Sequence, residues 1–210
     1  SLGNVFIQRL VNSFEDATMA AFTVGNRMEA YALVPIFGLN TGVATFTGQN
    51  VGALKYDRVH RGWKVSTIMS CVSSVAIGLV INLLAVQFAR LFNLSGEAMS
   101  QAVEYQRYMS YCVVLFAAYM PTSGLLQGAG DAIVVSCNSL ATLSVSVAAA
   151  YMLAYVFHVG YASCWLALPA GWAVGICIVI PRYFSRKWMT KRVVKDPIPE
   201  PETEEASLIE

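Results

Sequence analysis

The sequence has little charge. Only 13% of its 210 residues are charged, about half the share in a typical soluble domain, and 56% are hydrophobic. A water-soluble fold of this size cannot keep so much apolar surface away from solvent. The composition therefore favours a membrane protein.

The sequence also lacks the patterns of an enzyme or a metal site. No His/Glu or Cys pair has ligand spacing, and no phosphate-binding loop is present. The cysteines lie singly in apolar runs, where we interpret them as small hydrophobic residues. We expect no catalytic residue, no bound metal and no cofactor. The five cysteines are Cys71, Cys112, Cys137, Cys164 and Cys177.

There is no initiator methionine and no visible signal peptide. The sequence begins in an apolar pattern from Leu2 to Ile7. We interpret residues 1–14 as the truncated end of a transmembrane helix, too short to cross a bilayer alone.

Five longer apolar runs follow. Each has at least the roughly 20 residues that a helix needs to cross a bilayer. Residues 132–181 are too long for one span, and Gly160 marks the natural hairpin between two. The sequence predicts an all-α integral membrane protein, a polytopic helical bundle. The predicted spans cover residues 17–50, 65–92, 100–130, 132–157 and 160–184.

Basic residues gather at alternate connections. Under the positive-inside rule these connections lie in the cytoplasm, as do both ends of the chain. We expect a basic loop over 51–64 and a tail over 185–210 that is first basic, then acidic and disordered; a partner-binding tail is the alternative. Lipid headgroups explain the basic residues better than nucleic acid does. They are Lys55, Arg58, Arg61, Lys64, Arg182, Arg186, Lys187, Lys191, Arg192 and Lys195.

Two charges interrupt the first full span. Arg27 and Glu29 lie roughly ten residues inside it, where each charge costs about 2.5–3.5 kcal/mol. Two positions apart, they point to different sides of a helix and cannot simply pair. We predict that they line a polar pathway with nearby amides, which are Gln8, Asn12, Asn26 and Asn40. Alternatively, the span starts later and the charges lie near the outer surface.

Prolines and glycines add two further hypotheses. Pro35 and Pro121 lie well inside spans, where they form either hinges for alternating access or static kinks. Pairs of glycines four residues apart predict close helix packing. These pairs are Gly38–Gly42, Gly48–Gly52, Gly124–Gly128 and Gly171–Gly175.

Three segments in order carry a family resemblance. They are Asn12-Ser13-Phe14 with residues 20–29, residues 44–58, and Gln127-Gly128-Ala129-Gly130-Asp131. Together they resemble the C-terminal lobe of a bacterial multidrug and toxic compound extrusion (MATE) transporter of the DinF-like kind, over about residues 1–185. The motif residues at the connections are Gly48, Gln49, Asn50, Gly52, Asp57, Arg58, Gly128, Gly130 and Asp131; we expect Asp131 to cap a helix or shape the loop.

The resemblance implies one six-helix lobe, its first helix truncated, of a twelve-helix transporter. It implies a multi-pass protein of the plasma (inner) membrane that pairs with an N-terminal lobe. The implied activity is secondary antiport, exporting cationic or amphipathic drugs or metabolites in exchange for H⁺ or Na⁺. The acid that other family members carry on the tenth helix has no counterpart near Pro121. The alternatives are a lipid-linked oligosaccharide flippase of the same superfamily and a non-transporting membrane scaffold.

Overall fold

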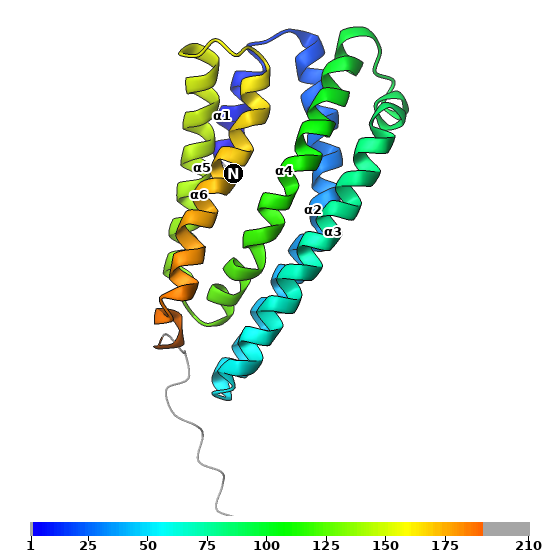
Figure 1. The fold of residues 1–210 in the computed structure, drawn as a ribbon. Coiled ribbons are helices and arrows are strands. Elements are labelled where there is room, and N and C mark those ends of the chain that lie inside the picture. Colours follow the sequence, from blue (N-terminus) through cyan, green and yellow to red (C-terminus); the bar gives the residue numbers. More distant parts are fainter. Residues whose placement is uncertain (1, 191–210) are drawn as a thin grey trace, which may run out of the picture.

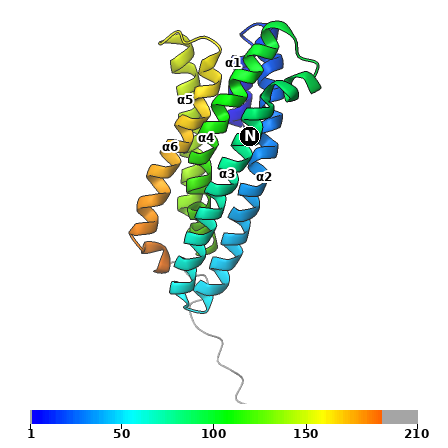
Figure 2. The same cartoon turned by 45° about the vertical axis from the view of Figure 1, so that its right-hand side comes forward.

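The chain folds into a bundle of helices that run up and down side by side (Figures 1 and 2). The computed structural model describes residues 2–190. In chain order the helices are α1 (Leu2–Val11), α2 (Asp16–Gly52), α3 (Tyr56–Leu91), α4 (Gly96–Gly128), α5 (Ala132–Tyr155), α6 (Ala162–Phe184) and the short 3₁₀ helix η1 (Lys187–Thr190). Five of them, α2 to α6, are long and apolar enough to cross a membrane. The predicted helical membrane bundle is confirmed.

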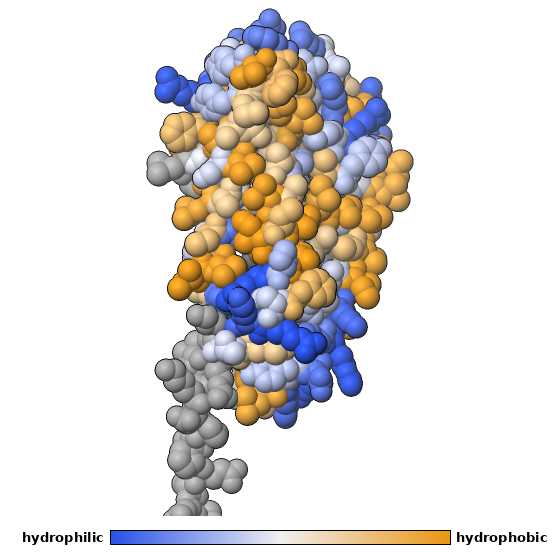
Figure 3. Space-filling model, turned by 60° about the vertical axis from the view of Figure 1, so that its left-hand side comes forward, coloured by the Kyte–Doolittle hydropathy of each residue, from blue (hydrophilic) through white to orange (hydrophobic). Residues whose placement is uncertain are grey.

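The surface of the bundle is apolar where a soluble protein would be polar. Along α3, Ile68, Val72, Leu79 and Leu83 are each at least 60% exposed. Hydrophobic residues cover the middle of the face shown in Figure 3, and hydrophilic residues gather toward both ends. Such a belt is stable only against lipid, because water would leave this much contiguous apolar surface unfavourably hydrated.

Helix α4 occupies the centre of the bundle. It packs extensively against α2 and α3, and it also contacts α6, whereas α5 packs mainly against α6. Two thirds of its most apolar window is buried, against about a fifth for α2 and α3. Most residues in this window of α4 are therefore shielded from lipid by neighbouring helices.

The first connection differs from the sequence prediction. The expected loop over 51–64 is mostly helical, because α2 continues to Gly52 and α3 already begins at Tyr56. Consequently Asp57 and Arg58 lie on the first turn of α3. The α2–α3 hairpin projects beyond the α4–α5 turn at the bottom of Figure 1. A criterion based on apolarity places the start of α3 too late, because charged residues continue the helix outside the hydrocarbon.

The other boundaries shift by a few residues. The span predicted over 100–130 begins at Gly96, and the one predicted over 160–184 begins at Ala162. Pro35 and Pro121 lie inside uninterrupted helices, so the hinge hypothesis stays a prediction. Of the predicted tail, residues 187–190 form η1, and residues 191–210 lie outside the described part.

Two of the family-motif segments meet where α4 crosses α2. A side-chain carbon built on Gly128 would lie 2.1 Å from the carbonyl oxygen of Ala44, and one on Gly124 would lie 2.5 Å from that of Asn40. Gly48 faces the same crossing, 3.3 Å from the carbonyl oxygen of Gly128 by the same measure. The predicted close packing holds for Gly124–Gly128. Gly171 approaches α5 in the same way, whereas Gly38 and Gly42 face open space.

The Gly130-Asp131 turn after α4 is fixed by an ion pair. Gly130 has a φ of +88°, a conformation that strongly favours glycine. Asp131 occupies the position before α5, but its side chain makes no capping hydrogen bond. Instead its buried carboxylate accepts a hydrogen bond of 2.6 Å from Nε of Arg182 on α6. Of the two roles expected for Asp131, capping is absent, and the ion pair agrees with a role in shaping the loop because it ties the α4–α5 turn to α6.

Candidate functional site

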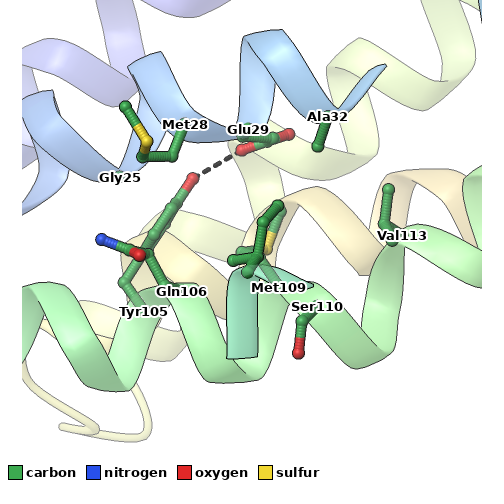
Figure 4. A pocket seen from close by; sticks show the side chains of 10 residues that line it. Gly25, Met28, Glu29, Ala32, Tyr105, Gln106, Met109, Ser110 and Val113 are labelled. Carbon is green, nitrogen blue, oxygen red and sulfur yellow. Dashed lines mark hydrogen bonds between the residues drawn. The ribbon is translucent and has the colours of Figure 1, made fainter. Parts of the chain in front are cut away.

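A carboxylate and a phenol meet between α2 and α4. The hydroxyl of Tyr105 donates a hydrogen bond of 2.6 Å to Oε2 of Glu29 (Figure 4). The same hydroxyl lies 3.3 Å from Oδ1 of Asn26, one turn earlier on α2. Glu29 is thirteen residues beyond the start of α2 at Asp16, which corresponds to about 20 Å along the helix. The pair therefore lies within the membrane-spanning part of the bundle.

The ring of Tyr105 has little freedom to move. It is fully buried, and it packs edge-on against Phe22 and Trp165, with centroid distances of 5.9 and 5.6 Å. Gly25 leaves room for it, because a side-chain carbon there would lie 2.2 Å from the ring. The protein thus fixes the hydroxyl that meets Glu29, and the carboxylate is held in one place.

A small cavity borders the carboxylate. It has a volume of about 20 Å³, which is room for one water molecule or one small cation. Gln106 lines it together with Glu29, and neither amide atom of Gln106 has a hydrogen-bond partner among the described residues. A buried amide without a partner is costly, so the hydrogen-bonding capacity of Gln106 is unused among the described residues. Carboxylate, hydroxyl and amide oxygens suit a proton or a hard cation such as Na⁺.

A larger cavity lies on the other side of Asn26. It measures about 370 Å³ and lies between α1, α2 and α6, with Gln8, Asn26 and Phe22 among its lining residues. On α1, Nε2 of Gln8 donates a hydrogen bond of 2.9 Å to Oδ1 of Asn12. The polar groups therefore form a series that runs from Gln8 and Asn12 past Asn26 to Tyr105 and Glu29.

Two residues predicted for the pathway lie elsewhere. Arg27 is exposed and lines neither cavity. Asn40 donates a hydrogen bond of 2.7 Å to the carbonyl oxygen of Met120, next to Pro121 on α4. This bond joins α2 to α4, which is a structural contact. Four of the six predicted pathway residues are thus brought together: Gln8, Asn12, Asn26 and Glu29.

Sequence reasoning missed Tyr105 and Gln106. Both lie in the part of α4 that begins with polar residues, and no local pattern separates them from interfacial residues such as Glu104 or Arg107. A signal was present in Gly25, a small residue one turn before Glu29. Within residues 2–190, no cluster of three or more His, Cys, Asp or Glu side chains could hold a metal ion.

Comparisons with known proteins agree on one family. A family model described as MatE matches residues 1–152. The probable multidrug resistance protein YoeA of Bacillus subtilis (strain 168) is 22% identical over 93% of this chain. This chain covers 42% of YoeA, so it spans less than half the length of that relative.

Solved structures with the same fold include two transporters. A MATE protein in the bent conformation superposes with a TM-score of 0.83 at 19% identity, covering 96% of this chain and 45% of that one. An outward-facing multidrug resistance MATE family transporter of the MOP superfamily superposes with a TM-score of 0.82 at 21% identity. The match covers 90% of this chain and 43% of that one. The chain therefore has the fold of a single lobe.

Proposed function

The chain belongs to the MatE family, and from that premise we propose that it forms the C-terminal lobe of a secondary active antiporter. The complete protein, with an N-terminal lobe, exports cationic or amphipathic drugs or metabolites in exchange for H⁺ or Na⁺. Its family consists of membrane transporters rather than enzymes. The direction of transport, the coupling ion and the substrate class are part of the proposal.

One observation carries the proposal: Glu29 is an acidic group inside the span, held by Tyr105 and bordered by space for a small cation. Intramembrane carboxylates are costly and mark ion or proton pathways. Binding of H⁺ or Na⁺ at Glu29 neutralises the carboxylate, and release restores its charge. A drug cation in the larger cavity beside Asn26 is attracted to the ionised carboxylate and loses that attraction when the carboxylate is occupied. The coupling ion and the drug cation therefore compete for the charge of one carboxylate, and this competition couples the movement of one to that of the other.

The proposal is tested by counterflow in proteoliposomes that contain the complete protein. We expect a preloaded fluorescent dye cation to leave the vesicles when an inward H⁺ or Na⁺ gradient is imposed, and to stay when the gradient is collapsed by an ionophore. Empty liposomes with the same gradient control for passive leak. Dye movement that is identical with and without either gradient contradicts the antiport mechanism.

We also propose that the α2–α3 and α4–α5 connections face the cytoplasm of a cell whose plasma (inner) membrane holds the protein. The charge distribution supports this orientation, because Lys55, Arg58 and Arg61 all lie at the same end of the bundle. In cells carrying a cysteine-free variant, Cys introduced at Arg58 is expected to resist an impermeant maleimide, whereas Cys introduced at Gly96 is expected to react. Equal reaction at both positions from the outside contradicts the arrangement.

The alternative functions have less support. A flippase for lipid-linked oligosaccharides needs a cationic lumen, but the residues lining the two cavities near Glu29 include no Lys or Arg. A scaffold has no use for a fixed carboxylate inside the span. Neither alternative explains the Glu29–Tyr105 pair.

A further inference from the structure

A groove that the transport mechanism does not use lies on the outside of the α2–α3 hairpin. Its volume is about 440 Å³, and residues of α2 near its end and of α3 near its start line it. Gly42 and Phe46 come from α2, and Arg58, Arg61 and Val65 come from α3. These residues lie close to the short connection between α2 and α3, which is at the bottom of the bundle in Figure 1.

Two glycines shape the groove. A side-chain carbon on Gly62 would lie 2.4 Å from the ring of Phe46, so the missing side chain lets this ring pack close against α3. Gly42 has nothing within 4 Å of the position where its side chain would be, so this part of the groove stays open. The apolar half of the groove is therefore a slot beside Phe46, with Val65 56% exposed at its side.

The other half of the groove carries two unpaired positive charges. Arg58 and Arg61 are three residues apart, which places them on the same face of α3. Both are exposed, and neither forms a hydrogen bond or an ion pair with another of the residues 2–190 through its side chain. Asp57 is adjacent in sequence but does not line the groove. Guanidinium groups bind phosphate oxygens in a bidentate manner, which suits two neighbouring arginines to one phosphate.

The turn of α3 that carries Arg58 and Arg61 is fixed in place by contacts on the opposite face of the helix. The indole of Trp63 donates a hydrogen bond of 2.9 Å to Oγ1 of Thr122 on α4 and stacks on Tyr183 with a centroid distance of 4.2 Å. The backbone that carries Arg58 and Arg61 is thus anchored to α4 and α6. A ligand at the arginines meets a site that is already organised, which lowers the entropy lost on binding.

We propose that this groove binds one anionic phospholipid, with its phosphate between Arg58 and Arg61 and an acyl chain along Phe46 and Val65. The charge of the groove selects a negative headgroup, and its apolar half selects a hydrocarbon chain. A soluble phosphate compound would leave that apolar half unused. The place of the groove, where α3 leaves the apolar belt, is the depth of lipid headgroups. The inference goes beyond the proposed transport activity and is tested without measuring transport.

The experiment is a lipid titration of the complete protein in mild detergent, with bound lipids counted by native mass spectrometry. We expect the wild type to bind one phosphatidylglycerol more tightly than phosphatidylcholine. In the Arg58→Gln/Arg61→Gln variant this preference falls by about fivefold for each arginine removed. The matched control is Lys55→Gln/Lys64→Gln, which removes the same charge from the same region but from outside the groove, and it is expected to retain the wild-type preference.

A second variant tests the apolar half. Gly42→Leu fills the open slot without a clash within the chain, and it is expected to weaken phosphatidylglycerol binding, whereas Gly52→Leu, at an equally open position outside the groove, leaves it unchanged. Displacement of the lipid by glycerol phosphate at equal concentration overturns the lipid assignment. Unchanged binding in both the arginine pair variant and Gly42→Leu overturns the site, as does an equal loss in the lysine control or equal affinity for phosphatidylcholine.

Discussion

Glu29→Gln in the complete transporter is expected to slow gradient-driven dye efflux by about ten- to hundredfold, because the coupling cation loses a charged partner worth about 1.5–3 kcal/mol. Glutamine keeps the volume of the side chain and still accepts a hydrogen bond from the Tyr105 hydroxyl, so we expect the fold to survive. It removes the one group that changes charge when a cation binds. The measurement is the initial efflux rate in proteoliposomes at matched protein content.

The companion variants separate the charge from its position. Tyr105→Phe removes the hydroxyl that holds the carboxylate, so we expect slower efflux but not its loss. Glu15→Gln is the matched control, because this carboxylate lies just before α2 without a capping hydrogen bond, and it is expected to behave as wild type. Wild-type efflux in Glu29→Gln would remove Glu29 from the pathway, whatever the behaviour of Tyr105→Phe.

Gly128→Leu is expected to lower the free energy of unfolding by about 1–3 kcal/mol or more, because the new side chain enters a place occupied by backbone. A side-chain carbon on Gly128 meets the carbonyl oxygen of Ala44 at 2.1 Å, and no rotamer relieves that contact. The helices α2 and α4 must move apart at this crossing. We expect a lower midpoint of thermal unfolding and a smaller monodisperse fraction in size-exclusion chromatography.

Gly38→Leu is the control for this packing prediction. The change is chemically the same, but nothing lies within 4 Å of a side-chain carbon built on Gly38. Because this side chain meets nothing within the lobe, we expect the midpoint of thermal unfolding to match that of the wild type. Equal stability of the Gly128 and Gly38 variants would show that the α2–α4 crossing tolerates a wider separation than the structure indicates.

The fold was predictable because lipid imposes simple rules. Runs such as 65–92 are too long and too apolar for anything except a membrane span. The resemblance of residues 44–58 to a known family implied the same helical membrane fold. The helical character of residues 56–64 was not predictable in the same way. Hydropathy detects where a segment leaves the hydrocarbon, whereas a helix ends only where its backbone hydrogen bonds end. In α3 the helix already begins at Tyr56, whereas the apolar run begins at residue 65, so Asp57 and Arg58 are helical but lie outside that run.

The candidate site was predictable only in part. Glu29 was identifiable because charge inside a span is expensive, and this argument needs no structure. Arg27 satisfies the same argument, yet it lies on the exposed side of α2, since two residues turn a helix by about 200°. Tyr105 is 76 positions from Glu29 in sequence. Only the packing of α4 against α2 brings them together, and a single sequence contains no record of that pairing.

The long α2–α3 hairpin has a practical consequence. At 37 residues, α2 is about 55 Å long, well beyond the roughly 30 Å of a hydrocarbon core. Its tip at Ala53 therefore stands clear of the bilayer, remote from Glu29. A fluorophore attached at Ala53 therefore reports the tilt of α2 relative to the membrane normal without contact with Glu29.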